Sequence, residues 1–395
     1  MDGHDLVFAV IGDVRLSGPA NEKALDGVVP QLKTLGVEAV VVCSAGGAVR
    51  LVPLADDQPF SAAVRKAFEE KTEAVDVIRF RGFDFVLNNV KRLSRMSANA
   101  LASAHADILK GTKSFFYFQR QHPRGTCAGD FVAEQDDGVA TAFLKGRANA
   151  VAFSVGAKAP LYDERSIRQG DFGFTAVQVS SFHTPHPFGG HENALPYGRS
   201  AADYRDDLQM PDLADHAVQH RPAVVVSVRD GRCVLSRWSL ARGKRLGEDW
   251  SVSPDAYGAY AYEARRKTCP VPAFATGACP SVRTGRGKTL KGMDAEQVTV
   301  SFPKAVGSRA YDYLVTVHFI QDGIDVVVAE RRVYSTGIFG PPDEEPDRVD
   351  CVFAKAELFQ DAWLTFEVRA LNAFGAQSAP ISCRGKVPSN VDWRG

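Results

Sequence analysis

The sequence predicts an α/β domain followed by a smaller all-β domain, and three observations support this division. Strand patterns alternate with helical patterns over roughly the first 170 residues, an order typical of α/β layers. Further along, strands follow one another without long helices, which favours an antiparallel sheet that completes the first domain. Short strands with alternating apolar residues then recur over residues 297–371, at the spacing of a β-sandwich.

The α/β part begins with a continuous apolar run. Residues 6–12 read Leu-Val-Phe-Ala-Val-Ile-Gly, which indicates a buried parallel strand that ends in a loop. A helix follows, with an apolar face that includes Leu25 and Leu32. By the same patterns we expect strands at residues 37–43, 75–80, 83–87, 114–118 and 150–154, and helices at residues 62–73, 98–109 and 137–145.

The antiparallel part is predicted from strands at residues 174–180, 223–228 and 233–240. The last two flank Asp230-Gly231, a dipeptide typical of two-residue hairpin turns. The first domain is therefore placed at residues 1–266.

A linker is predicted at residues 267–291, which are rich in Pro, Gly, Arg and Lys. Within it, residues 285–289 end like a phosphate-binding loop, but Val282 stands where the first glycine is required. We therefore interpret this stretch as basic linker. The all-β domain is placed at residues 292–388, with strands at 297–302, 311–319, 326–334, 349–353 and 364–371.

Charge and composition exclude several classes of protein. The chain has 47 Lys plus Arg and 47 Asp plus Glu, so it lacks the overall positive field that holds nucleic acid or an anionic membrane. No apolar run approaches the roughly 20 residues that span a bilayer, and no signal peptide is recognised. The seven cysteines include no Cys-x-x-Cys pair, which argues against a zinc site or a disulfide framework. We expect a soluble protein of the cytoplasm or another intracellular compartment.

Several motifs along the chain point to one family. Residues 163–167 read Asp-Glu-Arg-Ser-Ile and precede Gln169-Gly170, residues 116–123 read Phe-Tyr-Phe-Gln-Arg-Gln-His-Pro, and residues 246–250 read Leu-Gly-Glu-Asp-Trp. Together they resemble the calcineurin-like metallophosphoesterase family. Residues 368–375 resemble the fibronectin-III-like domain that follows it in one subfamily. The resemblance implies a metallophosphoesterase-like β-sandwich flanked by helices, followed by a fibronectin-III-like sandwich.

Members of that family hold two divalent metals, which demands carboxylate, imidazole and amide ligands at strand ends. By resemblance, the opening Gly-Asp-x-His corresponds to residues 12–15, which keep Asp13 but place Arg15 where a histidine should be. A guanidinium has no lone pair to give a metal. The second Gly-Asp falls on Ser44 and Ala45, so the bridging carboxylate is absent.

The remaining ligand positions are also altered. The Gly-Asn-His-Asp pattern falls on residues 88–91, which keep Asn89 but have Val90 in place of the histidine. The Gly-His-x-His pattern falls on residues 155–158, with Gly156 and Lys158 at the imidazole positions. At the histidine-containing strand end, either Arg120 fills the ligand position or His122 survives as a partial ligand.

These losses predict a pseudoenzyme: a catalytically inactive metallophosphoesterase-like protein that binds no cofactor and acts as a scaffold or subunit among other proteins. The alternative is a divergent metal-dependent phosphoesterase that holds Mn or Zn through Asp13, Asn89 and His122, or through histidines of the 183–191 stretch. Residues 181–192 contain His183, His186, His191 and Glu192, and the Pro and Gly residues among them favour a surface loop over a zinc site.

Two loops are candidates for protein contacts. Residues 182–197 contain Phe182, Phe188 and Tyr197 as aromatic anchors, and residues 341–350 are acidic. Cys43, just before the altered second motif, is interpreted as a buried thiol and not as a nucleophile.

Overall fold

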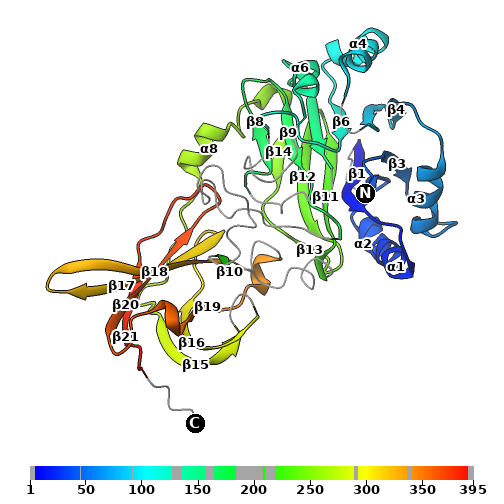
Figure 1. Cartoon of the computed structure of the whole chain (residues 1–395). Coiled ribbons are helices and arrows are strands. Elements are labelled where there is room, and N and C mark those ends of the chain that lie inside the picture. Colours follow the sequence, from blue (N-terminus) through cyan, green and yellow to red (C-terminus); the bar gives the residue numbers. More distant parts are fainter. Residues whose placement is uncertain are drawn as a thin grey trace. The chain divides into compact units, whose positions relative to one another are not determined.

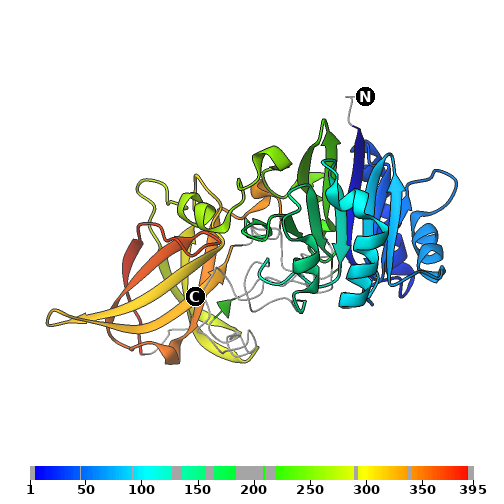
Figure 2. The ribbon, with the colours of Figure 1, turned by 90° about the horizontal axis from the view of Figure 1, so that it is seen from above.

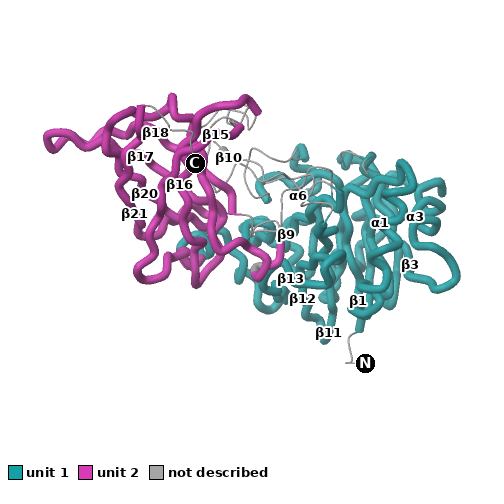
Figure 3. The backbone as a smooth tube through the Cα atoms, turned by 90° about the horizontal axis from the view of Figure 1, so that it is seen from below, with its two compact units in different colours: residues 1–188, 213–267 teal, residues 189–212, 268–395 magenta. Residues whose placement is uncertain are grey.

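The computed structural model describes residues 5–44, 46–90, 93–126, 136–155, 164–183, 208–209, 219–288, 292–335 and 340–389. The chain divides into two compact units (Figure 3). Unit 1 comprises Met1–Phe188 and Leu213–Lys267, and unit 2 comprises Gly189–Asp212 and Thr268–Gly395. Unit 1 combines sheets with helices, so the predicted mixed α/β class is confirmed. No helix among the described residues is both long and apolar enough to cross a membrane.

One sheet of unit 1 has seven strands in the order β13-β12-β11-β1-β2-β3, with β14 also paired to β12. β1 is central and runs parallel to β2 but antiparallel to β11. The predicted turn between β11 and β12 is present, with Asp230 and Gly231 at positive φ angles of 49° and 74°. The strands span Leu6–Val14 (β1), Ala39–Ser44 (β2), Val49–Pro53 (β3), Pro222–Arg229 (β11), Arg232–Ser239 (β12), Lys244–Arg245 (β13) and Trp250–Val252 (β14).

The second sheet of unit 1 has six strands in the order β4-β5-β6-β7-β9-β8. The four inner strands are parallel, and the outer strands β4 and β8 are antiparallel to their neighbours. The strands span Val75–Phe80 (β4), Phe83–Asn88 (β5), Phe115–Gln119 (β6), Ala150–Ser154 (β7), Ile167–Gln169 (β8) and Thr175–Gln178 (β9).

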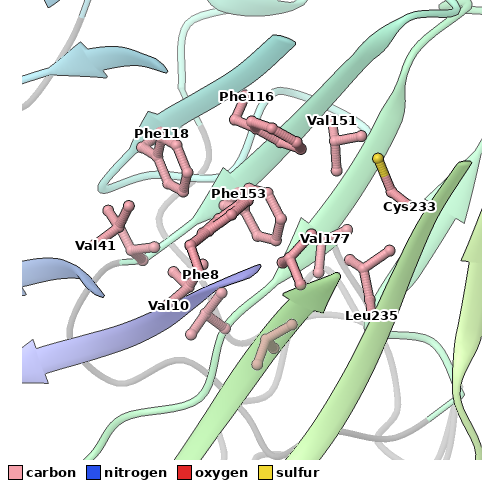
Figure 4. Close-up of a cluster of buried hydrophobic side chains, with 14 of the residues drawn as sticks. Phe8, Val10, Val41, Phe116, Phe118, Val151, Phe153, Val177, Cys233 and Leu235 are labelled. Atoms are coloured by element: carbon pink, nitrogen blue, oxygen red, sulfur yellow. The ribbon is translucent and has the colours of Figure 1, made fainter. Parts of the chain in front are cut away.

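The two sheets of unit 1 face each other across a shared apolar core (Figure 4). Phe8 of β1 lies at its centre, with its ring centroid 4.7 Å from that of Phe116 and 5.0 Å from that of Phe85. The alternate residues of β1, such as Ala9 and Ile11, pack on the other side of the sheet. β1 is therefore apolar on both faces, which explains its continuous apolar run.

Helices cover the outer face of each sheet in unit 1 (Figures 1 and 2). On the seven-stranded sheet these are α1 (Pro19–Gly27), α2 (Val29–Thr34) and α3 (Phe60–Glu69). On the six-stranded sheet they are α4 (Arg95–Ala104), α5 (Ala106–Lys110) and α6 (Val139–Leu144). Unit 1 ends with a 3₁₀ turn, η2 (Pro254–Ala256), and with α8 (Tyr262–Thr268), whose last residue already belongs to unit 2.

Unit 2 consists of two sheets around one apolar core. Three strands form the order β15-β16-β19, and five form the order β10-β18-β17-β20-β21. The strands span Leu208–Gln209 (β10), Ser281–Lys288 (β15), Asp294–Pro303 (β16), Asp312–Gln321 (β17), Ile324–Tyr334 (β18), Arg348–Ala354 (β19), Trp363–Leu371 (β20) and Ile381–Lys386 (β21). Short 3₁₀ turns lie at Pro342–Glu344 (η4) and Lys355–Glu357 (η5).

The prediction of a linker at residues 267–291 is wrong for residues 281–288, because these residues form β15. Its residues pair antiparallel with β16, from Ser281 opposite Ser301 to Lys288 opposite Asp294. Val282 is the only large apolar residue of β15, so backbone pairing at a sheet edge, and not apolar periodicity, defines this strand. Gly285 and Gly287 lie inside a strand, which also excludes a phosphate-binding loop for the described part of that motif.

Candidate functional site

The two sheets of unit 1 come together where β1 ends. Gly12 forms a parallel bridge with Ser181, a residue beyond the end of β9 in the other sheet, and the Phe182 amide donates to the Gly12 carbonyl at 2.9 Å. A Cβ on Gly12 would lie 3.0 Å from the Ser180 carbonyl oxygen and 3.3 Å from that of Val155. A Cβ here would crowd both carbonyls, so the close backbone approach favours glycine.

Asp13 lies at this junction and its carboxylate is already engaged. It is fully buried, and its φ of 51° is in the left-handed region. Ser181 Oγ donates to Asp13 Oδ2 at 2.7 Å, and Arg15 Nη2 lies 3.3 Å from the same oxygen. The structure thus brings Asp13 and Arg15 together as an ion pair, and a hydroxyl from the opposite sheet completes the arrangement.

His183 and Arg221 form the next layer of this site. Arg221 Nη1 lies 3.0 Å from His183 Nδ1, and its guanidinium lies over the Phe182 ring at 5.2 Å. Because a guanidinium can only donate, His183 Nδ1 accepts and the ring proton is on Nε2. Burial, assisted by the charge of Arg221, lowers the pKa of His183 to about 4, so the imidazole is neutral at pH 7.

Arg120 adds a third cation to this region, where both it and Asp13 act on the Cys43 thiol. Burial raises the pKa of the Cys43 thiol to about 12, while Arg120 and Asp13 act on that thiol in opposite directions. Arg120 also lies against the loop after β2, because a Cβ on Gly47 would come 2.9 Å from its Cδ. Cys43 is thus a buried, protonated thiol at neutral pH, in keeping with the interpretation made from the sequence.

Asn89 serves the structure in a different way. Its Oδ1 accepts from the Val49 amide at 3.1 Å and from Arg50 Nη1 at 3.0 Å, and its Nδ2 donates to Asp76 Oδ2 at 2.8 Å. Its amide therefore ties β3 to the segment around β4. Val90 is half-buried, and its amide donates to the Asn88 side chain at 3.3 Å.

His122 is buried, and burial alone lowers its pKa to about 3. Its carbonyl accepts from the Asp136 amide at 2.8 Å. The Asp136 carboxylate in turn accepts from three backbone amides, of Arg124, Gly138 and Ala140. The His122 backbone is therefore bonded to the backbone of Asp136, whose carboxylate organises the loop before α6.

Several predicted positions lie outside the described residues. These are Ala45, Gly156, Lys158, His186, His191 and Glu192. Of the loop at residues 182–197, only Phe182 and His183 are described. In the acidic loop, Asp347 pairs with Lys304 at 3.3 Å and Asp350 with Arg283 at 2.8 Å.

The junction has the electrostatic character of an anion site. Three guanidiniums, from Arg15, Arg120 and Arg221, accompany the single carboxylate of Asp13, and His183 is neutral. Two adjacent divalent metals need an excess of anionic ligands. Within the part of the chain that the structure describes, no group of three or more His, Cys, Asp or Glu side chains could hold a metal ion.

A second surface, in unit 2, was not anticipated from the sequence. The hairpin of β17 and β18 extends past the other strands of its sheet (Figure 2). Near its tip, Ile320 is 56% exposed, Ile324 66%, Val326 42% and Val327 57%. The continuous apolar run in β18 is typical of a buried strand, so the pattern alone concealed this exposure. We call these four residues the hairpin surface.

Comparison with known proteins finds no protein-family model that matches the chain and no match among curated proteins.

Proposed function

We propose that the chain is a non-catalytic protein of metallophosphoesterase-like fold that works as a protein-binding subunit of a larger assembly. Two features of unit 1 support the family resemblance. Two facing sheets carry helices on both outer sides, and the ends of β1 and β9 meet at Asp13. Unit 2 has one sheet of three antiparallel strands and one of four, and β10 is added at one edge of the second sheet. This arrangement supports a fibronectin-III-like sandwich.

The absence of catalysis is proposed from what occupies the junction. Arg15 and Ser181 both donate to Asp13 Oδ2, and the guanidinium of Arg15 offsets the charge of the carboxylate. A metal ion at Asp13 would have to displace the Arg15 guanidinium. The guanidiniums of Arg120 and Arg221 would then repel it. The proton on His183 Nε2 also opposes ligation, because binding through this atom requires a proton on Nδ1, which faces Arg221.

The hairpin surface is the observation that carries the binding role. Four large aliphatic side chains project from one hairpin, and Phe359 and Trp363 of the same unit are also half-exposed. By the strand register, Ile324 and Val326 project from one face of the hairpin, and Ile320 and Val327 project from the other. Both faces of the tip are therefore apolar and exposed, which is typical of interaction sites in soluble proteins.

β18 also presents an open sheet edge beside the hairpin surface. β10 pairs in parallel with this edge, but only opposite Arg332 and Val333. Among the described residues, no strand pairs with this edge from Ile324 to Arg331. β10 shows that the edge accepts an extended segment. We therefore propose that the partner adds a strand here, with apolar side chains against the hairpin surface and basic ones near Asp325 and Glu330.

The test is affinity purification from the native source, comparing the wild type with an Ile324→Thr, Val327→Thr double variant. We expect the wild type to retain defined companions and the variant to lose them. Met96→Thr is the matched control, since Met96 is 80% exposed and lies in α4 of unit 1. Hydrogen exchange on the purified complex should show protection of the amides of residues 324–330. A wild-type protein that runs alone, or a complex without that protection, contradicts the proposal.

The competing function, a divergent phosphoesterase around Asp13 with His122 or His183, is tested separately. The purified protein is incubated with Mn²⁺ and with Zn²⁺, and bound metal and hydrolysis of 4-nitrophenyl phosphate are measured. We expect neither stoichiometric metal nor hydrolysis above background. Bound metal with hydrolysis that disappears in both Asp13→Asn and His183→Gln would instead establish the enzyme.

A further inference from the structure

The outer face of the six-stranded sheet in unit 1 carries a pocket with no assigned role. It has a volume of about 540 Å³, within the range of small-molecule sites. Residues of α4 and α6, two helices that contact each other, line this pocket. Figure 1 shows where the two helices lie. Ala98 and Leu109 form part of its lining and belong to the buried core beneath it, and Ala102 and Phe143 pack against that core. The pocket therefore offers an apolar surface to a ligand.

Its polar lining is cationic. Arg95 at the start of α4 and Arg147 after α6 both line the pocket, together with the carboxylate of Asp137 and the side chain of Asn99. Among the described residues, neither guanidinium forms an ion pair. Two cations against one anion leave a net single positive charge in the lining.

Arg147 supplies the observation that points to a ligand. Its Nε is enclosed, yet it has no hydrogen-bond partner among the described residues. A buried donor without a partner costs about 1–3 kcal/mol, a cost that a bound acceptor removes. The turn that carries Arg147 is fixed, because the Arg147 amide donates to the Leu144 carbonyl and the Arg147 carbonyl accepts from Ala150. The backbone of Arg147 is thus fixed at the pocket, and its enclosed Nε has no acceptor among the described residues.

We propose that this pocket binds a small organic monocarboxylate, with its carboxylate at Arg147 and Arg95 and its apolar body over Ala102 and Phe143. A bidentate guanidinium matches a carboxylate in geometry and charge. Asp137 disfavours a dianion such as inorganic phosphate, because two cations then face three negative charges. The inference is independent of the protein-binding role, because it concerns residues of unit 1 alone.

The experiment is titration of the full chain with 4-phenylbutyrate, octanoate and indole-3-acetate, followed by isothermal calorimetry and ligand-observed NMR. We expect saturable one-to-one binding of at least one of the three. The alcohol 4-phenylbutan-1-ol should bind at least about tenfold more weakly than 4-phenylbutyrate, and inorganic phosphate should not compete. Absence of saturable binding up to about 5 mM for all three carboxylates overturns the proposal, as does equal binding of the alcohol or displacement by phosphate.

Variants locate the site. Arg147→Gln and Arg95→Gln should each weaken carboxylate binding about tenfold, and Ala102→Leu should weaken it by filling the space for the apolar body. Lys145→Gln is the matched control, since Lys145 is exposed and does not line the pocket. Thermal unfolding of each variant confirms folding, and Arg95 and Ala102 provide two further readouts should Arg147→Gln fail to fold. Carboxylate binding that is unchanged in all the folded pocket variants places the ligand elsewhere and refutes the assignment.

Discussion

The β11–β12 hairpin of unit 1 and the β17–β18 hairpin of unit 2 have the same turn but different surroundings. Each is closed by a two-residue Asp-Gly turn, with φ of 49° and 74° at Asp230 and Gly231, and of 51° and 80° at Asp322 and Gly323. In the first hairpin, Val226 and Leu235 are fully buried between two sheets. In the second, the hairpin surface is exposed. The turn fixes which residues pair, but packing by distant segments decides which of them are buried.

The largest difference should appear when one apolar side chain is shortened in each hairpin. Leu235→Ala removes contacts from the fully buried core of unit 1 and should cost about 3 kcal/mol of unfolding free energy. Val327→Ala, on the hairpin surface, should change it by less than about 0.5 kcal/mol. Urea unfolding of both variants measures the two effects. Equal losses would mean that the β17–β18 tip is covered in the protein alone.

Thiol reactivity should separate the hairpins almost as strongly. Burial raises the pKa of the Cys233 thiol in β12 to about 11. At pH 8 this thiol should react with iodoacetamide at least about a hundredfold more slowly than the one introduced by Val327→Cys. Peptide mass spectrometry assigns the sites, with the exposed Cys279 as an internal reference. Rapid labelling of Cys233 in the native protein would show that β12 opens.

Polar side-chain pairs at the two hairpins should differ by a smaller amount. Arg237 of β12 is buried, with Nη2 3.1 Å from Glu164 Oε1 and its guanidinium over Trp250 at 4.2 Å. Glu164→Gln should cost about 2 kcal/mol, because it leaves that buried guanidinium without its carboxylate. Asp325→Asn removes the 3.0 Å pair with His318 at the other hairpin and should cost about 0.5 kcal/mol. Denaturant midpoints test this, and a larger loss in Asp325→Asn would reverse the ranking.

The smallest contrast should come from the turns themselves. Gly231→Ala and Gly323→Ala each place a Cβ on a left-handed residue with nothing within 4 Å of it. Each should therefore cost about 1 kcal/mol through backbone conformation alone, and the two values should agree within about 0.5 kcal/mol. The same unfolding measurements provide the values, and a large disagreement would show that one turn is held by contacts beyond its own backbone.

Strands and helices with a strong apolar pattern could be predicted from the sequence. Burial on one face requires apolar residues at regular intervals, and burial on both faces requires a continuous apolar run. β1, β6 and β7 are such strands. β15 could not be predicted in this way, since Ser281–Lys288 alternates exposed and half-buried side chains and joins its sheet through backbone hydrogen bonds. The exposure of Ile324 and Val327 could not be predicted from the sequence either, because β-branched residues favour strands whether or not anything covers them.

The candidate site could be predicted from the sequence only in part, for a similar reason. Asp13 lies at the end of β1, where functional side chains are expected, and this strand end was located from the sequence. Arg221 and Ser181 reach the site from other segments, and nothing local marks them as neighbours of Asp13. The sequence did offer one signal for this site, the two serines Ser180 and Ser181 directly after an apolar strand. Polar residues at that position lie at the same edge of the sheets as Asp13.

The pairing of β1 with β11 has a consequence for synthesis of the protein. β1 leaves the ribosome well before β11, because its partner residues, such as Val228 opposite Leu6, are made only near the end of unit 1. Until then, Phe8 and Val10 lack the strand that shields one side of them, although β2 can already pair with the other side. Contacts so distant in sequence form slowly and leave apolar surface exposed meanwhile. A nascent chain halted before Pro222 should therefore depend on chaperones, whereas one that extends past Ser239 can close the sheet by itself.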